Sequence, residues 1–214
     1  MLVSQVMTKN PVYIDPDSSL IETQSLMDKE KIKYLPVLDK NNTLVGIITR
    51  EDLAKAGPSG ATTLDMYEIS YLLSQMKVSE VMINKVITVD ENETIEEAAR
   101  IMADKGIDSL PVMNCSVLVG IVTDTDLFNL YQNIFGERHK GVRVIITVDE
   151  KPGQIAAIAT AISERGGNIV SFVSCEGEDV AHRRDTIKVK GLTKDELEMI
   201  IKRIPGVVLD DIRE

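Results

Sequence analysis

The first 130 residues of this chain contain one pattern twice. Residues 3–39 match the residues 75 positions further on without a gap, after which the second copy lacks one residue. The matching segments are Val3-Ser4, Val6-Met7, Leu35-Pro36-Val37 and Leu44-Val45-Gly46-Ile47, which return as Val78-Ser79, Val81-Met82, Leu110-Pro111-Val112 and Leu118-Val119-Gly120-Ile121. A repeat of fixed period indicates structural units that cover each other's apolar faces. The sequence therefore predicts two similar units with a shared cleft.

Each copy is predicted to fold as strand, helix, strand, strand, helix. Apolar residues at i, i+3, i+4 and i+7 predict an amphipathic helix in the second copy, and the first copy has a weaker stripe at the same place. These positions are Ile95, Ala98, Ala99 and Met102, and Leu20, Thr23, Gln24 and Met27. Short apolar runs on either side of polar turn formers predict a hairpin in each copy. The runs are 34–38 with 44–48, and 109–113 with 117–122.

The segment between the copies predicts a break followed by a helix. Gly57-Pro58-Ser59-Gly60 interrupts regular structure, and a helical pattern resumes over 64–76. We expect this helix to pack across both repeats; whether it only covers the core or also makes a bundle or dimer contact stays open. The expected domains are repeat 1 (1–60), a linker helix (61–77), repeat 2 (78–135) and a further domain (141–214).

The final domain has a different pattern. Apolar runs at 142–148, 169–175, 186–189 and 207–209 predict strands, and helical stripes follow Pro152 and Thr193. Pro152 is expected at the first position of its helix, a place that suits proline. The residues 182–184 are expected in a loop. The order βαββαβ predicts a ferredoxin-like fold, so the chain as a whole is of the α/β (α+β) class.

Composition narrows the partners. The net charge of −10 argues against nucleic acid, because phosphate binding rests on basic patches. No apolar run reaches the roughly 20 residues of a membrane helix. Cys115 and Cys175 lack a paired motif, which predicts buried, reduced thiols, and His139 and His182 lack metal-ligand spacing. We expect a cytoplasmic protein without a metal site or membrane contact.

A threonine and an aspartate recur where each second hairpin strand should enter a helix. Thr49 and Asp52 stand in the first copy, and Thr123 and Asp126 in the second. Their spacing fits a capping box, which satisfies free backbone donors at a helix start. A short carboxylate there can also accept hydrogen bonds from ribose hydroxyls, and the helix start attracts phosphate. The spacing alone leaves both interpretations open.

The repeat resembles the CBS domain, named after cystathionine β-synthase, and two in tandem resemble a Bateman module. The resemblance rests on Val-Ser-x-Val-Met, Ile-x-x-Leu-Pro-Val and Val-Gly-Ile-(Ile/Val)-Thr-x-x-Asp-Leu, each present twice. It implies a cleft that binds adenosine compounds such as AMP, ADP, ATP or S-adenosylmethionine. It also implies that Asp52 and Asp126 bind ribose and that Thr49 and Thr123 contribute hydroxyl contacts.

The same resemblance places a charged residue three before each central proline, where it faces phosphate. That residue is Lys33 in the first copy, followed by Tyr34, and Asp108 in the second. With Arg50 opposed by Asp124 at another aligned position, we predict two unequal sites, the phosphate lying near Lys33, Tyr34 and Arg50. The alternative is that Lys33 and Arg50 are solvated surface charges.

The final domain resembles the ACT domain, a regulatory module of amino-acid metabolism. The resemblance rests on Asp149-Glu150-Lys151-Pro152-Gly153 and Gly166-Gly167-Asn168-Ile169. It implies an amino-acid site involving Glu150, Pro152, Gly153 and Asn168, usually at a dimer interface. The alternative is that these residues only shape turns and that the domain only dimerises.

The arrangement of tandem CBS and ACT domains resembles the acetoin-utilisation protein B group, as does the linker segment 61–73. No nucleophile with a base, metal cluster or phosphate loop is visible, so we expect no catalytic residues and no required cofactor. The hypothesis is a regulatory sensor that binds adenosine compounds, forms a homodimer and acts on a protein partner. The alternative is an assembly module with vestigial nucleotide sites.

Overall fold

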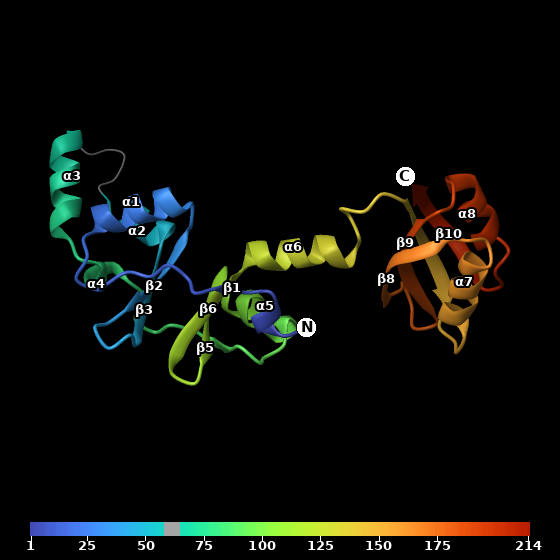
Figure 1. The fold of residues 1–214 in the computed structure, drawn as a ribbon, viewed down its shortest axis with the longest axis horizontal. Coiled ribbons are helices and arrows are strands. Elements are labelled where there is room, and N and C mark those ends of the chain that lie inside the picture. Colours follow the sequence, from blue (N-terminus) through green and yellow to red (C-terminus); the bar gives the residue numbers. More distant parts are fainter. Residues whose placement is uncertain (58–64) are drawn as a thin grey trace. The chain divides into compact units, whose positions relative to one another are not determined.

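A computed structural model describes residues 1–57 and 65–214 of the chain. It divides into two compact units, Met1–Leu127 and Phe128–Glu214 (Figure 1). The break expected at 58–60 and the first linker residues, 61–64, lie outside the described residues.

The first unit holds both repeats. Its elements are η1 (Val3–Gln5), β1 (Thr8–Lys9), α1 (Leu20–Glu30), β2 (Tyr34–Leu38), β3 (Leu44–Thr49), α2 (Arg50–Ala56), α3 (Met66–Gln75), α4 (Val78–Val81), β4 (Val89–Asp90), α5 (Ile95–Lys105), β5 (Ser109–Asn114) and β6 (Val117–Thr123). Helix α6 (Asp124–Ile134) begins in this unit and continues into the next. The two hairpins, β2 with β3 and β5 with β6, lie where the polar turns predicted them.

The segment that opens each repeat packs on the other repeat. Strand β1 pairs with β6 of the second copy, and the backbone nitrogen of the buried Val3 donates to the Glu93 carbonyl at 2.9 Å. In the same way, Val78 donates to the Ser18 carbonyl at 2.9 Å and packs in the first repeat's core with Leu20 and Met27. The first strand expected in repeat 1 is reduced to a single bridge, while β1 joins the other sheet.

A glycine in each hairpin accommodates this exchange. A Cβ atom on Gly120 would lie 2.3 Å from the sulfur of Met7, and one on Gly46 would lie 2.4 Å from the sulfur of Met82. Any side chain at either position would displace the methionine of the exchanged segment. The two motifs that recur in the sequence, Val-Met and Val-Gly-Ile, therefore meet in space.

Helix α3 packs on the first repeat through its described side chains. It contacts α1, and Leu73, with Met76 just beyond its end, packs on the core of the first repeat. Tyr67, Tyr71 and Leu72 are exposed. The predicted helix is present, but its packing across both repeats is wrong, because its apolar contacts go to the first repeat.

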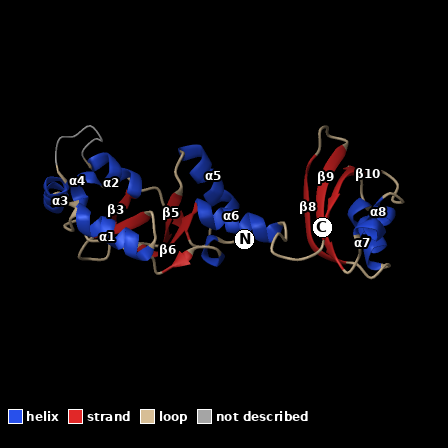
Figure 2. Ribbon diagram, turned by 90° about the horizontal axis from the view of Figure 1, so that it is seen from above, coloured by secondary structure: helices blue, strands red, loops and turns tan. Residues whose placement is uncertain are grey.

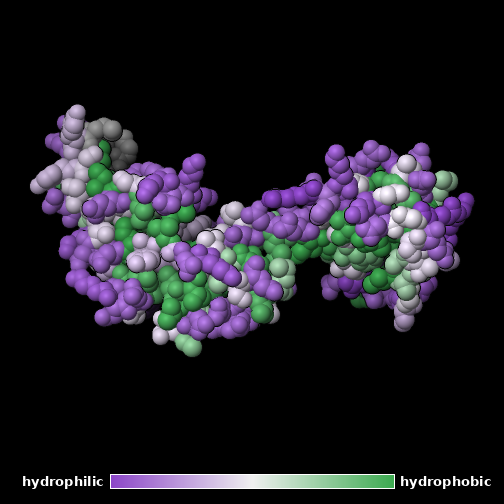
Figure 3. All heavy atoms as spheres, viewed as in Figure 1, coloured by the Kyte–Doolittle hydropathy of each residue, from purple (hydrophilic) through white to green (hydrophobic). Residues whose placement is uncertain are grey.

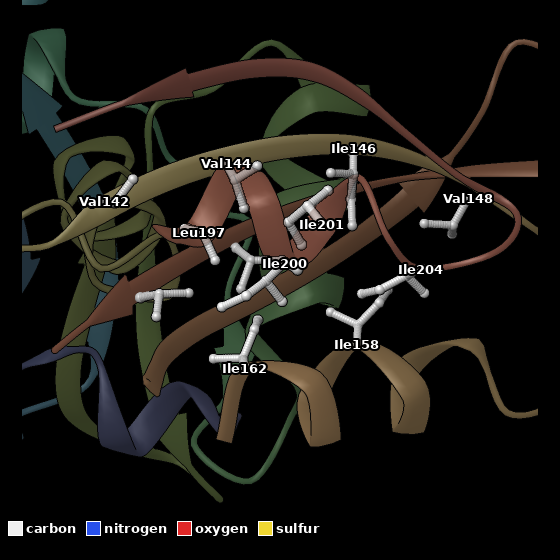
Figure 4. Packing of buried hydrophobic residues seen from close by; sticks show 12 residues of the cluster. Val142, Val144, Ile146, Val148, Ile158, Ile162, Leu197, Ile200, Ile201 and Ile204 are labelled. Carbon is white, nitrogen blue, oxygen red and sulfur yellow. The ribbon is translucent and has the colours of Figure 1, made fainter. Parts of the chain in front are cut away.

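The second unit has the predicted βαββαβ order. Its elements are β7 (Val142–Asp149), α7 (Gln154–Ser163), β8 (Asn168–Glu176), β9 (His182–Lys190), α8 (Lys194–Ile201) and β10 (Val207–Arg213). The strands form an antiparallel sheet in the order β10-β7-β9-β8, with both helices on one face (Figure 2). Valine and isoleucine side chains of β7 meet those of α7 and α8 in the core (Figure 4). The ferredoxin-like fold is confirmed.

Three local expectations were wrong. Helix α7 begins at Gln154, because Gly153 precedes it in the left-handed region at φ 93°; Pro152 lies before the helix. Strand β9 begins at His182, since residues 182–184 pair with β7, and Arg183 also pairs with Glu176 of β8. Cys115 and Cys175 are exposed, the first in a turn and the second near the end of an edge strand.

Hydrophilic residues make up much of the face shown in Figure 3.

Candidate ligand site of the paired repeats

Both predicted capping boxes are formed. Thr49 Oγ1 accepts a hydrogen bond from the Asp52 nitrogen at 3.1 Å, and Asp52 Oδ2 accepts from the Thr49 nitrogen and hydroxyl at 2.9 and 2.7 Å. The corresponding distances for Thr123 and Asp126 are 3.4, 2.8 and 2.8 Å. In both copies, no described residue donates to the second oxygen, Oδ1. The capping interpretation is thus correct, and each aspartate retains an acceptor that a ligand hydroxyl could use.

A cavity opens beside the first of these pairs. Its volume is about 530 Å³, and Thr49 and Asp52 line it, whereas Thr123 and Asp126 do not. Its apolar lining comes from both repeats: Ile47 from the first, and Ile83, Val86, Ile87, Ile107 and Pro111 from the second. This volume lies within the range of small-molecule sites, and a partly apolar wall suits a flat aromatic base.

The charged lining is mixed, and two of its cations are already paired. Arg50 lies 2.7 Å from Asp28, and Lys55 lies 2.9 Å from Glu51. Lys33 and Lys85 also line the cavity, and neither forms an ion pair with a described residue. These two ammonium groups therefore supply the uncompensated positive charge at the site.

Lys33 and Asp108 line the same cavity. Our prediction assigned them to separate sites, but each directly precedes a central strand, β2 or β5, and the beginnings of both strands face this space. Lys33 and Asp108 therefore do not distinguish a basic site from an acidic one, because both contribute to a single cavity. Asp124, in contrast, is not part of the lining.

Tyr34 of the first repeat is influenced by negative charges of the second repeat. Its ring lines the cavity, and burial, followed by the negative charges of Asp124 and Asp108, raises the pKa of its hydroxyl to about 12. The group is therefore a neutral hydrogen-bond donor at neutral pH.

Of the residues predicted to bind nucleotide, Lys33, Tyr34, Thr49, Arg50 and Asp52 line this one cavity, and Thr123 and Asp126 do not. Sequence reasoning missed Lys85 and the apolar residues around it. The position of this segment directly after the repeated Val81-Met82 pattern was the available clue, because that pattern marks the stretch that docks on the first repeat.

The residues predicted for the ACT site do not gather within one chain. Glu150, Pro152 and Gly153 lie in the loop after β7, next to the end of the sheet where Arg183 pairs with Glu176. Asn168 pairs with Lys190 at the opposite end of β8. A nine-residue strand separates the two groups by about 27 Å.

Residues 1–57 and 65–214 contain neither a metal-ligand cluster nor a membrane-spanning helix. No group of three or more histidine, cysteine or acidic side chains in these ranges could hold a metal ion. No helix among them combines the length and apolar character needed to cross a membrane.

The repeats match the model of the CBS domain family at residues 3–59 and 78–133, and residues 142–198 match the ACT domain. This chain belongs to the CBS domain family. It is a tandem CBS protein with a C-terminal ACT domain, similar to the acetoin utilization protein AcuB from Vibrio cholerae. That structure covers 65% of this chain and 98% of its own, with 30% identity and a TM-score of 0.53.

Solved CBS pairs of similar fold contain adenosine compounds. One, in complex with 5′-methylthioadenosine and S-adenosyl-L-methionine, is 29% identical, has a TM-score of 0.52, and covers 65% of this chain and 98% of its own. Another, CBSX2 with AMP, is 28% identical, has a TM-score of 0.51, and covers 62% and 97%.

Sequence relatives include enzymes that are much longer than the match. L-aspartate semialdehyde sulfurtransferase of Methanocaldococcus jannaschii is 31% identical over 131 residues, which are 61% of this chain but 23% of the enzyme. An uncharacterized protein of the same organism is 33% identical over 59% of this chain and 89% of its own length. CBS and ACT domains are regulatory modules, and the enzymes are fusions with CBS domains.

Proposed function

We propose that this chain is a non-catalytic sensor that binds an adenosine compound in the cavity beside Asp52. The observation that carries the proposal is that a capping Thr-Asp pair, an apolar wall and two ammonium groups that form no ion pair with the described residues line one space of about 530 Å³. Solved CBS pairs of similar fold hold S-adenosyl-L-methionine, 5′-methylthioadenosine or AMP, which supports the same ligand class here.

The residues divide the ligand into three parts. The ribose hydroxyls donate to Asp52, whose Oδ1 is available while Oδ2 is held by Thr49. The adenine lies against the apolar lining formed by Ile83, Val86 and Ile87. Phosphate, where the ligand has one, is attracted by Lys33 and Lys85.

A matched pair of variants tests the site. Asp52→Asn should weaken the binding of AMP by about 10- to 100-fold, because a charged acceptor for ribose hydroxyls is lost. Asp126→Asn changes an equivalent capping box that does not line the cavity, so it controls for the loss of capping. Calorimetry on the full chain compares the two.

Equal effects of the two variants would remove Asp52 from the proposed site. If the unaltered chain bound none of AMP, ADP, ATP or S-adenosylmethionine, the assembly module with vestigial sites would be the better account.

For the ACT domain we infer a dimeric role. A site that uses both the Glu150–Gly153 loop and Asn168 must take them from two chains, because they lie at opposite ends of β8 in one. Light scattering with and without amino acids tests this inference, which predicts a homodimer. A monomer at all concentrations would contradict it.

A further inference from the structure

Arg50 holds the end of a neighbouring helix. Its Nε donates to the Ile32 carbonyl at 3.0 Å and its Nη2 to the Met27 carbonyl at 3.0 Å. The same Nη2 lies 2.7 Å from Asp28 Oδ1. Met27 and Asp28 belong to the last turns of α1, and Ile32 follows its C-cap, so one guanidinium spans the whole C-terminal end of that helix.

The chemistry of a helix end explains this contact. The last carbonyls of a helix have no partners within it and carry partial negative charge. A guanidinium is planar, presents several donors at fixed angles and remains charged. It can therefore donate at the same time to the Met27 carbonyl in the last turns of α1, to the Ile32 carbonyl just beyond the helix and to the Asp28 carboxylate, and charge-assisted bonds of this kind are strong.

Arg50 is also the first residue of the helix that carries the candidate ribose acceptor. It follows Thr49 and precedes Asp52 by two positions, and its backbone nitrogen donates to the Lys33 carbonyl at 2.9 Å. Through its side chain and its backbone, Arg50 thus connects the first turn of α2 to the end of α1 and to Lys33, which precedes β2. A phosphate would have to compete with Asp28 for the guanidinium.

We propose that Arg50 is a positioning residue for the Asp52 cavity and not a ligand of phosphate. It fixes Thr49 and Asp52, so it contributes the same factor to the binding of every adenosine compound, with or without phosphate. This inference rests on the proposed function.

The second repeat provides an internal comparison. Asp124 stands at the position of Arg50, and its backbone nitrogen keeps the equivalent bond, to the Asp108 carbonyl at 2.9 Å. Its carboxylate instead accepts hydrogen bonds from the neighbouring Thr125. In the first repeat, Arg50 connects the start of α2 to the end of α1. The Thr-Asp pair of this same repeat lines the cavity.

Calorimetric titration of the full chain with adenosine, AMP and ATP tests the assignment. Arg50→Ala should weaken all three by one common factor of about ten, the loss expected for a misplaced charged acceptor. Lys33→Ala should weaken AMP and ATP more than adenosine. Arg100→Ala is the matched control, since Arg100 bridges two acidic residues on the exposed face of α5, outside the cavity; it should change none of the affinities.

Titrations are made well below the melting temperature of each variant. A larger loss for ATP than for adenosine with Arg50→Ala would make Arg50 a phosphate ligand and overturn the inference. A lower melting temperature with unchanged affinities would also overturn it, because the role would then be structural only. Where Arg50→Ala does not fold, Asp28→Asn provides a second test, because it releases the guanidinium from its ion pair. A gain in affinity for ATP but not for adenosine would then show that Arg50 binds phosphate, and it would overturn the inference. If the unaltered chain binds none of the three compounds, the proposed function fails with it.

Discussion

Asp185 is a buried carboxyl group in the ACT domain. It is 1% exposed, and neither of its oxygens has a hydrogen-bond partner of ordinary geometry among the described residues. Burial raises the pKa of this carboxyl, the nearby Ser174 hydroxyl and Arg183 lower it in part, and Glu150 raises it further. The net direction is upward, so the carboxyl is protonated more readily in the folded domain than in the unfolded chain.

This shift has a definite consequence for stability. A carboxyl group with a raised pKa stabilises the fold fully below its unfolded pKa of about 3.9, and that contribution is lost as the pH rises through the folded pKa. Asp185→Asn removes the charge and should raise the free energy of unfolding near pH 8 by on the order of 1 kcal/mol. Denaturant unfolding at several pH values measures it.

Asp195→Asn, at an exposed position in the first turn of α8, is the control and should show no such pH-dependent gain. Destabilisation by Asp185→Asn at every pH would mean that the carboxylate has a partner in the folded state and would refute this account.

At the scale of elements, the two repeats end their first helices differently. The residue after α1 is Lys31, in the left-handed region at φ 56°, and the residue after α5 is Gly106 at φ 63°. Glycine adopts this conformation without steric cost, whereas a side chain there is strained. The sequence therefore contains its own comparison of two residues in one backbone conformation.

Lys31→Gly should raise the free energy of unfolding of the first unit by about 0.5 to 1 kcal/mol, and Gly106→Lys should lower it by a similar amount. Chemical denaturation followed by circular dichroism checks both. Effects of the same sign in the two variants would contradict this explanation.

The sequence predicted most elements because local pattern controls them. Strand β5, helix α5 and the order of the ACT domain follow from hydrophobic period and turn residues. The exchange of opening segments was not predictable, because a repeat shows which residues correspond and not which copy each contacts. The extension of β9 to His182 was missed because polar residues at a strand end are held by pairing with β7 and β8.

The residues of the candidate site likewise fall into those that local sequence predicts and those that depend on tertiary contacts. Thr49 and Asp52 were predicted from a local motif, since capping depends on residues three positions apart. The contacts of Arg50 with carbonyls 23 and 18 residues earlier are tertiary and leave no mark in local spacing. The joint presence of Lys33 and Asp108 in one cavity likewise depends on how two strands meet.

For the whole molecule, the proposed ligand of the CBS cavity and the proposed ACT dimer are two points at which we expect small molecules to act. Binding to the native state raises its stability by an amount set by ligand concentration, about 2.7 kcal/mol at 100 times the dissociation constant. Coupling between the domains requires two states with different affinities. Ligand binding to the first unit must therefore be measured before any coupling between the domains.

A crystal structure of the full chain grown with AMP tests the central claim most directly. The proposed function predicts one AMP in the cavity beside Asp52, with a ribose hydroxyl within hydrogen-bond distance of the Asp52 carboxylate and the phosphate near Lys33 or Lys85. An empty cavity at saturating AMP, or AMP bound only beside Asp126, would contradict the account.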